Sequence, residues 1–294
     1  MPAVWKYTKV IRKVGSQPQN PYDGTLVVES GVRDQYASTP YVDTGLVNDT
    51  TYFYAAYAYT IQFVVSEGAF TSCHLFGFDS ILENNTWEQI DQAGAIGLAP
   101  SLWEIGDEKN FTVSGEALTS VILDFDHDDA SDGSGKVPMS FGLKELMANK
   151  RGWSQVYGGR WYGYLDSGIP DYLSNTVIPG LPESLQGFLK TVNKTYDKAS
   201  TTKISIPTLN EVNGTGVMTN GSDRPTGGGY QYPYFATTQK RIKRLANGSG
   251  AVAEWYVASN HGGNTGYYPV AINEAGESKW ATSDNYGICF CFYI

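Results

Sequence analysis

Residues 255–294 read WYVASNHGGNTGYYPVAINEAGESKWATSDNYGICFCFYI, and this stretch alternates between two kinds of sequence. Short apolar runs stand at Trp255–Val257, Pro269–Ile272 and Ile288–Ile294, whereas Gly, Asn, Tyr and other polar residues fill the segments between them. Nine of these residues are aromatic and only four are charged. We expect the apolar runs to be buried anchors and the intervening segments to lie at the surface.

The segments between the anchors have the composition of a recognition surface. Tyr and Trp supply a large contact area with few rotatable bonds, and Asn, Ser and Gly supply adaptable hydrogen bonds, as in antibody loops. The alternative is a glycine-rich terminus whose aromatics fill the core, and we favour it for Trp255 and Tyr286. Exposure is expected where polar residues flank the ring, as at Tyr267, Tyr268 and Trp280. The predicted ligand-binding residues are Tyr256, Asn260, His261, Asn264, Tyr267, Tyr268, Glu274, Lys279, Trp280, Asp284 and Asn285.

The composition of the whole 294-residue chain narrows the class of protein. Charged residues make up 17%, against about 25% in an ordinary soluble domain, and aromatics make up 14%, so the chain can bury a large core. The net charge of −9 would repel a phosphate backbone, so nucleic acid is not expected as a partner. No apolar run approaches the ~20 residues of a membrane-spanning helix, and the N-terminus lacks the apolar core of a signal peptide. We therefore expect neither membrane insertion nor classical secretion.

Residues 1–65 are expected to form β-structure. The stretch YVDTGLVNDTTYFYAAYAY, from residue 41 onward, resembles the corner and penultimate strand of a fibronectin type III domain. In that family a leucine packs under the corner and a tyrosine supplies its hydroxyl to the backbone; Leu46 and either Tyr52 or Tyr54 hold those places here. A complete domain of this class needs about 100 residues, so we expect this one to be incomplete or completed by other segments. Residues 66–84 are expected to be a linker.

Between this linker and the C-terminal stretch, the pattern predicts a mixture of helices and strands. Thr86 can cap a helix that continues to Ile96 with apolar residues at helical spacing. The apolar run at residues 121–125 predicts a buried strand. Residues 182–196 predict a second helix, with Pro182 in its first turn. The predicted fold class is α+β.

Six segments in this order carry a second resemblance. It covers residues 85–294 and is to C-type-lectin-fold domains of phage tail proteins and gut bacteria, which share the core of sulfatase-modifying factors. Family members usually carry an arginine in the motifs at residues 255–260 and 287–291, and both are absent here, so contacts made by those arginines are not expected. The segments are WEIGDEKNFTVSG from Trp103, VILDFDH from Val121, LPESLQGFLKTVNKTY from Leu181, ISIPTLNEV from Ile204, AEWYVASNHGGN from Ala253 and NYGICFCFYI from Asn285.

The lectin-fold resemblance implies a function as well as a fold. Its members include the variable proteins of diversity-generating retroelements, in which adenine-directed mutagenesis turns Asn codons into Tyr, His, Ser, Asp, Gly or Thr. The many Asn, Tyr, His, Ser, Asp, Gly and Thr residues among positions 260–285 are consistent with that process. The resemblance implies a non-enzymatic receptor- or ligand-binding protein of a phage tail tip or a bacterial surface. Its expected partners are a host-cell surface protein or glycan, other tail proteins and further copies in a homotrimer, which would add avidity. A structural tail subunit is an alternative.

Three other groups of residues have both a structural and a chemical interpretation. Cys289 and Cys291 are expected to be packed thiols, and the alternative is an oxidase of the formylglycine-generating type that uses them. The acidic residues at 124–132, with His127, could supply oxygen ligands to Ca²⁺, but they lack EF-hand spacing and favour a solvated loop. The basic run at 240–244 favours a solvated face over a contact with an anion. We therefore expect no cofactor and no metal, with Ca²⁺ as the alternative.

Overall fold

The computed structural model describes residues 4–153, 163–196, 198–218, 228–263, 266–282 and 285–294, and within residues 260–268 it describes only the backbone. The chain divides into two compact units, Met1–Gly77 (unit 1) and Phe78–Ile294 (unit 2). None of the helices in the described ranges has both the length and the apolar character that crossing a bilayer requires.

Unit 1 contains a four-stranded antiparallel sheet with the strand order β2-β1-β3-β4. Its small core consists of Ile11, Ala55, Tyr57 and Tyr59, with the Tyr7 ring stacked on Tyr59 at 4.4 Å between centroids. The alternation of residues along the strands places these side chains on one face. The strands are β1 (Trp5–Val14), β2 (Thr25–Ser30), β3 (Thr50–Thr60) and β4 (Ala69–Leu75).

Tyrosine hydroxyls fix the chain that leads into β3. The Tyr52 hydroxyl accepts a hydrogen bond from the backbone N–H of Val47 at 2.7 Å. The Tyr54 hydroxyl donates to the carboxylate of Asp43 at 2.9 Å, and Arg12 also binds that carboxylate. Burial, followed by the hydrogen bond to Asp43, raises the pKa of Tyr54 to about 12. The prediction that one of these tyrosines bonds to the backbone is confirmed at Tyr52.

The segment at residues 66–84, predicted as a linker, is mostly structured. Strand β4 lies within it and pairs with β3 from Thr50↔Leu75 to Ala56↔Ala69. A 3-10 helix at Leu82–Asn84 then begins the ordered structure of unit 2. The β4 residues are mostly exposed, so the sequence AFTSCHL lacks the buried alternation by which a strand is recognised.

Unit 2 combines short helices with antiparallel sheets, which agrees with a mixed α and β composition. Its largest sheet has the order β10-β14-β7-β6-β5, so the C-terminal strand lies inside the sheet. Strand β5 alternates exposed and buried residues, whereas β7 and β14 are buried throughout. The strands are β5 (Glu108–Val113), β6 (Glu116–Phe125), β7 (Met139–Leu143), β10 (Ile204–Ser205) and β14 (Cys291–Tyr293).

Helix α1 (Trp87–Ala95) packs its apolar face on this sheet. The Trp87 ring lies 5.8 Å from Phe141 and 5.9 Å from Phe292, both edge-on, and those two phenylalanines stack on each other at 5.2 Å. Thr86 accepts from the backbone of Gln89 and the Gln89 side chain accepts from the backbone of Thr86, a complete capping box. The helix predicted from Thr86 is confirmed.

The second predicted helix, at residues 182–196, is wrong beyond its first turn. Helix α5 (Glu183–Gln186) ends at Gly187, and the chain then extends into β8 (Val192–Thr195), which pairs with β9 (Ala199–Thr202). The strand buries Val192 and Lys194, so tertiary packing overrides the helical spacing. The remaining helices are α2 (Ala99–Leu102), α3 (Gly168–Tyr172), α4 (Ile178–Gly180), α6 (Leu209–Asn213) and α7 (Thr238–Arg241), with 3-10 turns at Tyr164–Asp166 and Pro233–Ala236 and a π turn at Leu173–Val177.

Candidate functional site

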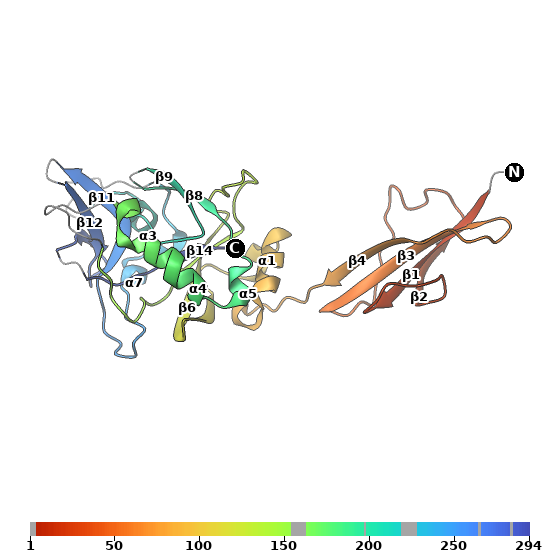
Figure 1. Ribbon diagram of the computed structural model, residues 1–294, viewed down its shortest axis with the longest axis horizontal. Helices are drawn as coiled ribbons and strands as arrows, with labels where there is room; N and C mark the ends of the chain where they lie inside the picture. The colour runs from red at the N-terminus through yellow and green to blue at the C-terminus, as the bar shows by residue number, and fades with distance from the viewer. Residues whose placement is uncertain (1–3, 154–162, 197, 219–227, 264–265, 283–284) are drawn as a thin grey trace. The chain divides into compact units, whose positions relative to one another are not determined.

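The C-terminal stretch forms a second, three-stranded antiparallel sheet in unit 2. Its order is β11-β12-β13, with β11 at Trp255–Gly263, β12 at Gly266–Ile272 and β13 at Ser278–Trp280. Figure 1 shows β11 and β12 at one edge of unit 2, at the opposite end of that unit from α1. The hairpin therefore runs from the interior of unit 2 to its edge.

The base of the β11–β12 hairpin is part of the core. Residues 255–259 on β11 and 269–272 on β12 are buried, and Trp255 pairs with Ile272 across the strands. The register shifts between Val257 and Asn260, which marks a bulge in β11. The predicted anchors at 255–257, 269–272 and 288–294 are all buried.

Tyr256 is a correction to the predicted binding surface. Its side chain is 0% exposed, and its ring lies 4.9 Å from both Trp153 and Tyr286. A β11 residue that faces the core in this way has no access to a ligand. The sequence could not separate Tyr256 from the exposed set because it stands between the anchor and the polar segment.

The predicted residues after β12 lie at or near the surface. Glu274 and Asn285 are exposed, and Trp280 is half-buried and packs against the core, contrary to its expected exposure. Lys279 binds Glu254 at 2.6 Å. Burial works to lower the pKa of Lys279, but the hydrogen bond and charge of Glu254 together with Tyr286 outweigh this effect, and the pKa is raised.

The structure brings four more predicted residues together through their backbones. His261 pairs with Tyr268, Asn260 pairs with Pro269, and Gly262 pairs with Tyr267 across the hairpin. Asn260, His261, Tyr267 and Tyr268 therefore lie in the distal half of the hairpin, where no side chain is described. Asn264 and Asp284 lie outside the described residues.

The two C-terminal cysteines are packed in the core. Cys289 and Cys291 are both fully buried. Burial raises the pKa of Cys289 and raises that of Cys291 well above its ordinary value. A reactive thiol needs an accessible, electropositive environment that favours the thiolate. Both thiols are inaccessible, and their raised pKa values disfavour the thiolate. The oxidase alternative is therefore weakened.

A buried polar cluster that the sequence did not predict lies elsewhere in unit 2. The Lys194 ammonium contacts Asp128 Oδ1 at 2.5 Å, Glu211 Oε1 at 2.6 Å and the Tyr232 hydroxyl at 3.0 Å. Asp128 Oδ2 also accepts from Ser140 at 2.5 Å and from Tyr232 at 2.8 Å. Each of these groups is buried, and each has hydrogen-bond partners.

The charges of the cluster stabilise one another. Burial acts to lower the pKa of Lys194, but the neighbouring Glu211, Tyr232, Tyr293 and Asp128 outweigh it and raise that pKa well above its ordinary value. Burial acts to raise the pKa of Asp128, but Lys194, with smaller contributions from Ser140 and His127, outweighs it and lowers that pKa. Both side chains are therefore charged at neutral pH.

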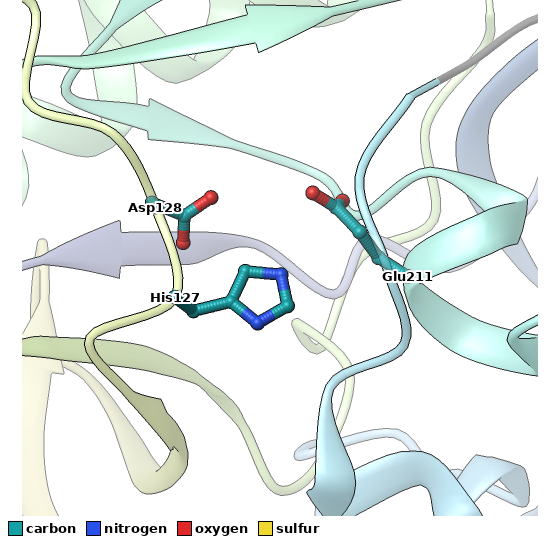
Figure 2. A group of neighbouring side chains, drawn as sticks. All are labelled: His127, Asp128 and Glu211. Carbon is teal, nitrogen blue, oxygen red and sulfur yellow. The ribbon is translucent and has the colours of Figure 1, made fainter. Parts of the chain in front are cut away.

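His127 lies beside this cluster with only one of its nitrogens paired. Its side chain is 2% exposed, its Nδ1 lies 2.8 Å from Asp124 Oδ2, and its Nε2 has no partner among the described residues. Its ring lies between Tyr230, at 3.9 Å, and Tyr232, at 4.0 Å. Figure 2 shows the His127 ring and the carboxylates of Asp128 and Glu211 facing one another.

The acidic residues predicted as one possible Ca²⁺ loop divide into separate groups. Asp124 binds His127, and Asp128 belongs to the buried cluster. Asp129 is paired with Lys136 at 2.7 Å, and the exposed Asp132 accepts from the backbone of Ser134. In the described part of the chain, these carboxylates therefore do not converge on one point.

Comparison with known proteins gives no relative for either unit: no family model, no curated protein and no solved structure matches this chain.

Proposed function

We propose that this chain is a non-enzymatic binding protein whose unit 2 displays a contact surface on the distal half of the β11–β12 hairpin, residues 260–268, and on the turn between β12 and β13. The observation that carries the proposal is the division of residues 255–294. Their apolar anchors are buried, whereas the backbones of Asn260, His261, Tyr267 and Tyr268 lie on a hairpin at the edge of unit 2.

The buried anchors support this function because they hold the hairpin on a rigid base. Residues 286–294 are buried, β14 lies inside the largest sheet, and the Trp255 indole donates to the Arg241 carbonyl at 3.0 Å. Binding residues on loops that a rigid scaffold positions are a common arrangement, and the scaffold tolerates their variation. Within this proposal, unit 2 has a C-type-lectin-like fold with the core of sulfatase-modifying factors.

The proposal places the protein at a phage tail tip or, as the second choice, at a bacterial cell surface. Unit 1 then serves as a fibronectin type III-like spacer, for which the Tyr52 hydroxyl bond to Val47 is the supporting contact. A homotrimer would present three hairpins and increase avidity. The ligand is a host-cell surface protein or glycan. The oxidase alternative loses support from the burial of both C-terminal cysteines.

Binding of the fluorescently labelled chain to a panel of intact bacterial cells tests this function. The variant Tyr267→Ala with Tyr268→Ala should lose at least 10-fold in affinity for the cells that the wild type binds, because aromatic residues dominate such surfaces. The matched control replaces the exposed Tyr22 and Tyr41 of unit 1 by Ala, and it should bind normally. Unchanged binding by the hairpin variant would contradict the assignment and favour a structural tail subunit.

The DNA around the gene tests the retroelement origin separately. A near-copy of the codons for residues 255–294 that differs only at adenines, beside a reverse-transcriptase gene, is the expected finding. A locus without such a copy would contradict the retroelement origin but would not contradict the assignment of the binding surface.

A further inference from the structure

The orientation of His127 indicates a ligand that the protein itself does not supply. Asp124 accepts at 2.8 Å from Nδ1, so the proton lies on Nδ1, because an ionised carboxylate only accepts. Nε2 then carries a free lone pair inside the protein, and a buried polar atom without a partner is costly. The two tyrosine rings hold the imidazole in this orientation.

The lone pair is directed at groups that also only accept. Nε2 faces the carboxylates of Asp128 and Glu211, and one donor atom from each of the three residues lies within 4.8 Å of the others. Nε2 has no hydrogen-bond partner in the described chain, whereas the two carboxylates already accept from the Lys194 ammonium. A second cation, bound to Nε2 and to the remaining lone pairs of these carboxylates, would give Nε2 the partner that it lacks.

The charge of the cluster supports the same conclusion. The buried carboxylates of Asp128 and Glu211 share one ammonium, that of Lys194, and the Asp124 carboxylate pairs with His127. Together these groups carry a formal charge of −2 when His127 is neutral. Buried charge without compensation is expensive. One divalent cation would bring the cluster to neutrality. The nearby Asp129 and Lys136 compensate each other and do not alter this count.

We propose that His127 Nε2, Asp128 and Glu211 form a binding site for a divalent transition-metal ion of the Zn²⁺ class. A neutral imidazole with two carboxylates is a ligand set that zinc accepts, whereas Ca²⁺ prefers oxygen ligands alone. The Nδ1–H bond from His127 to Asp124 is the contact that metal-binding histidines usually make through their second nitrogen. Zinc bonds are about 2.0–2.2 Å long, which separates tetrahedral donors by roughly 3.4 Å, so donor atoms up to 4.8 Å apart would move toward one another to share an ion.

Lys194 is compatible with this site as a hydrogen-bond donor to its carboxylates. Its ammonium bonds Asp128 Oδ1 and Glu211 Oε1, and a carboxylate oxygen has a second lone pair for a metal. Ligating carboxylates are commonly hydrogen-bonded in this way. A pocket of about 210 Å³ borders His127, Lys194 and Glu211 and offers room for the ion and the water that would complete its coordination.

In the test, the full chain is stripped of metal with a chelator, loaded with Zn²⁺ and then dialysed against buffer without metal. The wild type should retain one zinc per chain after dialysis, excess Ca²⁺ should not displace it, and Co²⁺ should bind with visible d–d absorption. His127→Phe keeps a ring between Tyr230 and Tyr232 but removes the ligand, so it should abolish this binding. Asp124→Asn should weaken zinc binding by roughly 10–100-fold.

The matched control removes an exposed Cys–His pair that could bind zinc at the surface. Cys73 and His74 are adjacent and exposed on β4, and the variant Cys73→Ser with His74→Phe should bind zinc as the wild type does. A wild type that retains no stoichiometric zinc, or a His127→Phe variant that retains it fully, would overturn the proposal. If circular dichroism shows that His127→Phe does not fold, two other measurements decide. A normal zinc affinity of Asp124→Asn, or the absence of d–d bands from the cobalt-loaded wild type, would contradict the site.

Discussion

At the scale of single residues, the Lys194 ammonium connects the buried polar cluster of unit 2. It lies in the core with Asp128, Glu211 and Tyr232 around it, and those three contacts use its three N–H donors. Each partner comes from a different element or loop, so one side chain joins β8 to α6 and to the segment that follows β6. Removing one partner of such a network leaves the opposite charges buried and unpaired.

Lys194→Met should therefore lower the free energy of unfolding of unit 2 by about 3–5 kcal/mol. Lys198→Met is the matched control, because its ammonium lies in an exposed pair with Asp166 at 3.4 Å and should cost less than ~1 kcal/mol. Denaturant unfolding followed by tryptophan fluorescence measures both. Equal losses in the two variants would show that the buried cluster contributes no more than a surface pair.

The three cysteines give a second prediction at this scale. Cys73 is exposed, whereas Cys289 and Cys291 are buried. The raised pKa values of these two buried thiols disfavour the reactive thiolate. A soluble thiol reagent should label one cysteine of the folded chain rapidly and the other two only after unfolding. Cys73→Ser should leave no rapidly labelled thiol. Rapid labelling of Cys289 or Cys291 in that variant would restore the oxidase alternative.

At the scale of elements, the sequence predicts structure well where local signals agree with packing. The helix after Thr86 has a capping residue and apolar positions at helical spacing, and α1 forms there because its apolar face also meets the sheet. At residues 182–196 the same kind of spacing fails, because Gly187 ends α5 and the following residues pair with β9. Which pattern prevails depends on partners distant in sequence, and the sequence alone does not supply them.

The two candidate sites differ, for the same reason, in how well the sequence predicts them. The buried anchors around the hairpin are local runs, so their burial could be predicted from residues 255–294 alone. The polar cluster could not, since Lys194 lies 66 residues from Asp128 and 17 from Glu211. The Asp124–His127 pair is local, three residues apart, but its sequence favours a solvated acidic loop over a buried contact.

The testable prediction at the scale of elements concerns the corner that precedes β3. Tyr52→Phe removes the hydroxyl that accepts from Val47 and should cost about 0.5–1.5 kcal/mol of the stability of unit 1. Tyr41→Phe is the control, since that tyrosine is partly exposed and contacts Tyr36 through its ring. Thermal unfolding followed by circular dichroism compares them. Equal melting temperatures for wild type and Tyr52→Phe would show that the hydroxyl bond does not stabilise the corner.

At the scale of the whole molecule, we expect stability and binding to depend on different residues. The described buried residues of unit 2 include those of α1, of the largest sheet and of the base of the β11–β12 hairpin, up to Ser259 on β11 and from Pro269 on β12. The proposed metal site lies on other segments, around His127 and Glu211. Changes at residues 260–268 should therefore alter binding without unfolding the chain.

Exchange of residues 260–268 for other nine-residue sequences of Asn, Ser, Asp, Gly and Tyr tests this central claim most directly. The account predicts melting temperatures within about 2–4 °C of the wild type, equivalent to ~1 kcal/mol in a domain of this size. It also predicts that the panel of bacterial cells bound by the labelled chain changes with the exchanged sequence. Exchanged chains that fold normally and bind the same cells as the wild type would contradict it, as would chains that no longer fold.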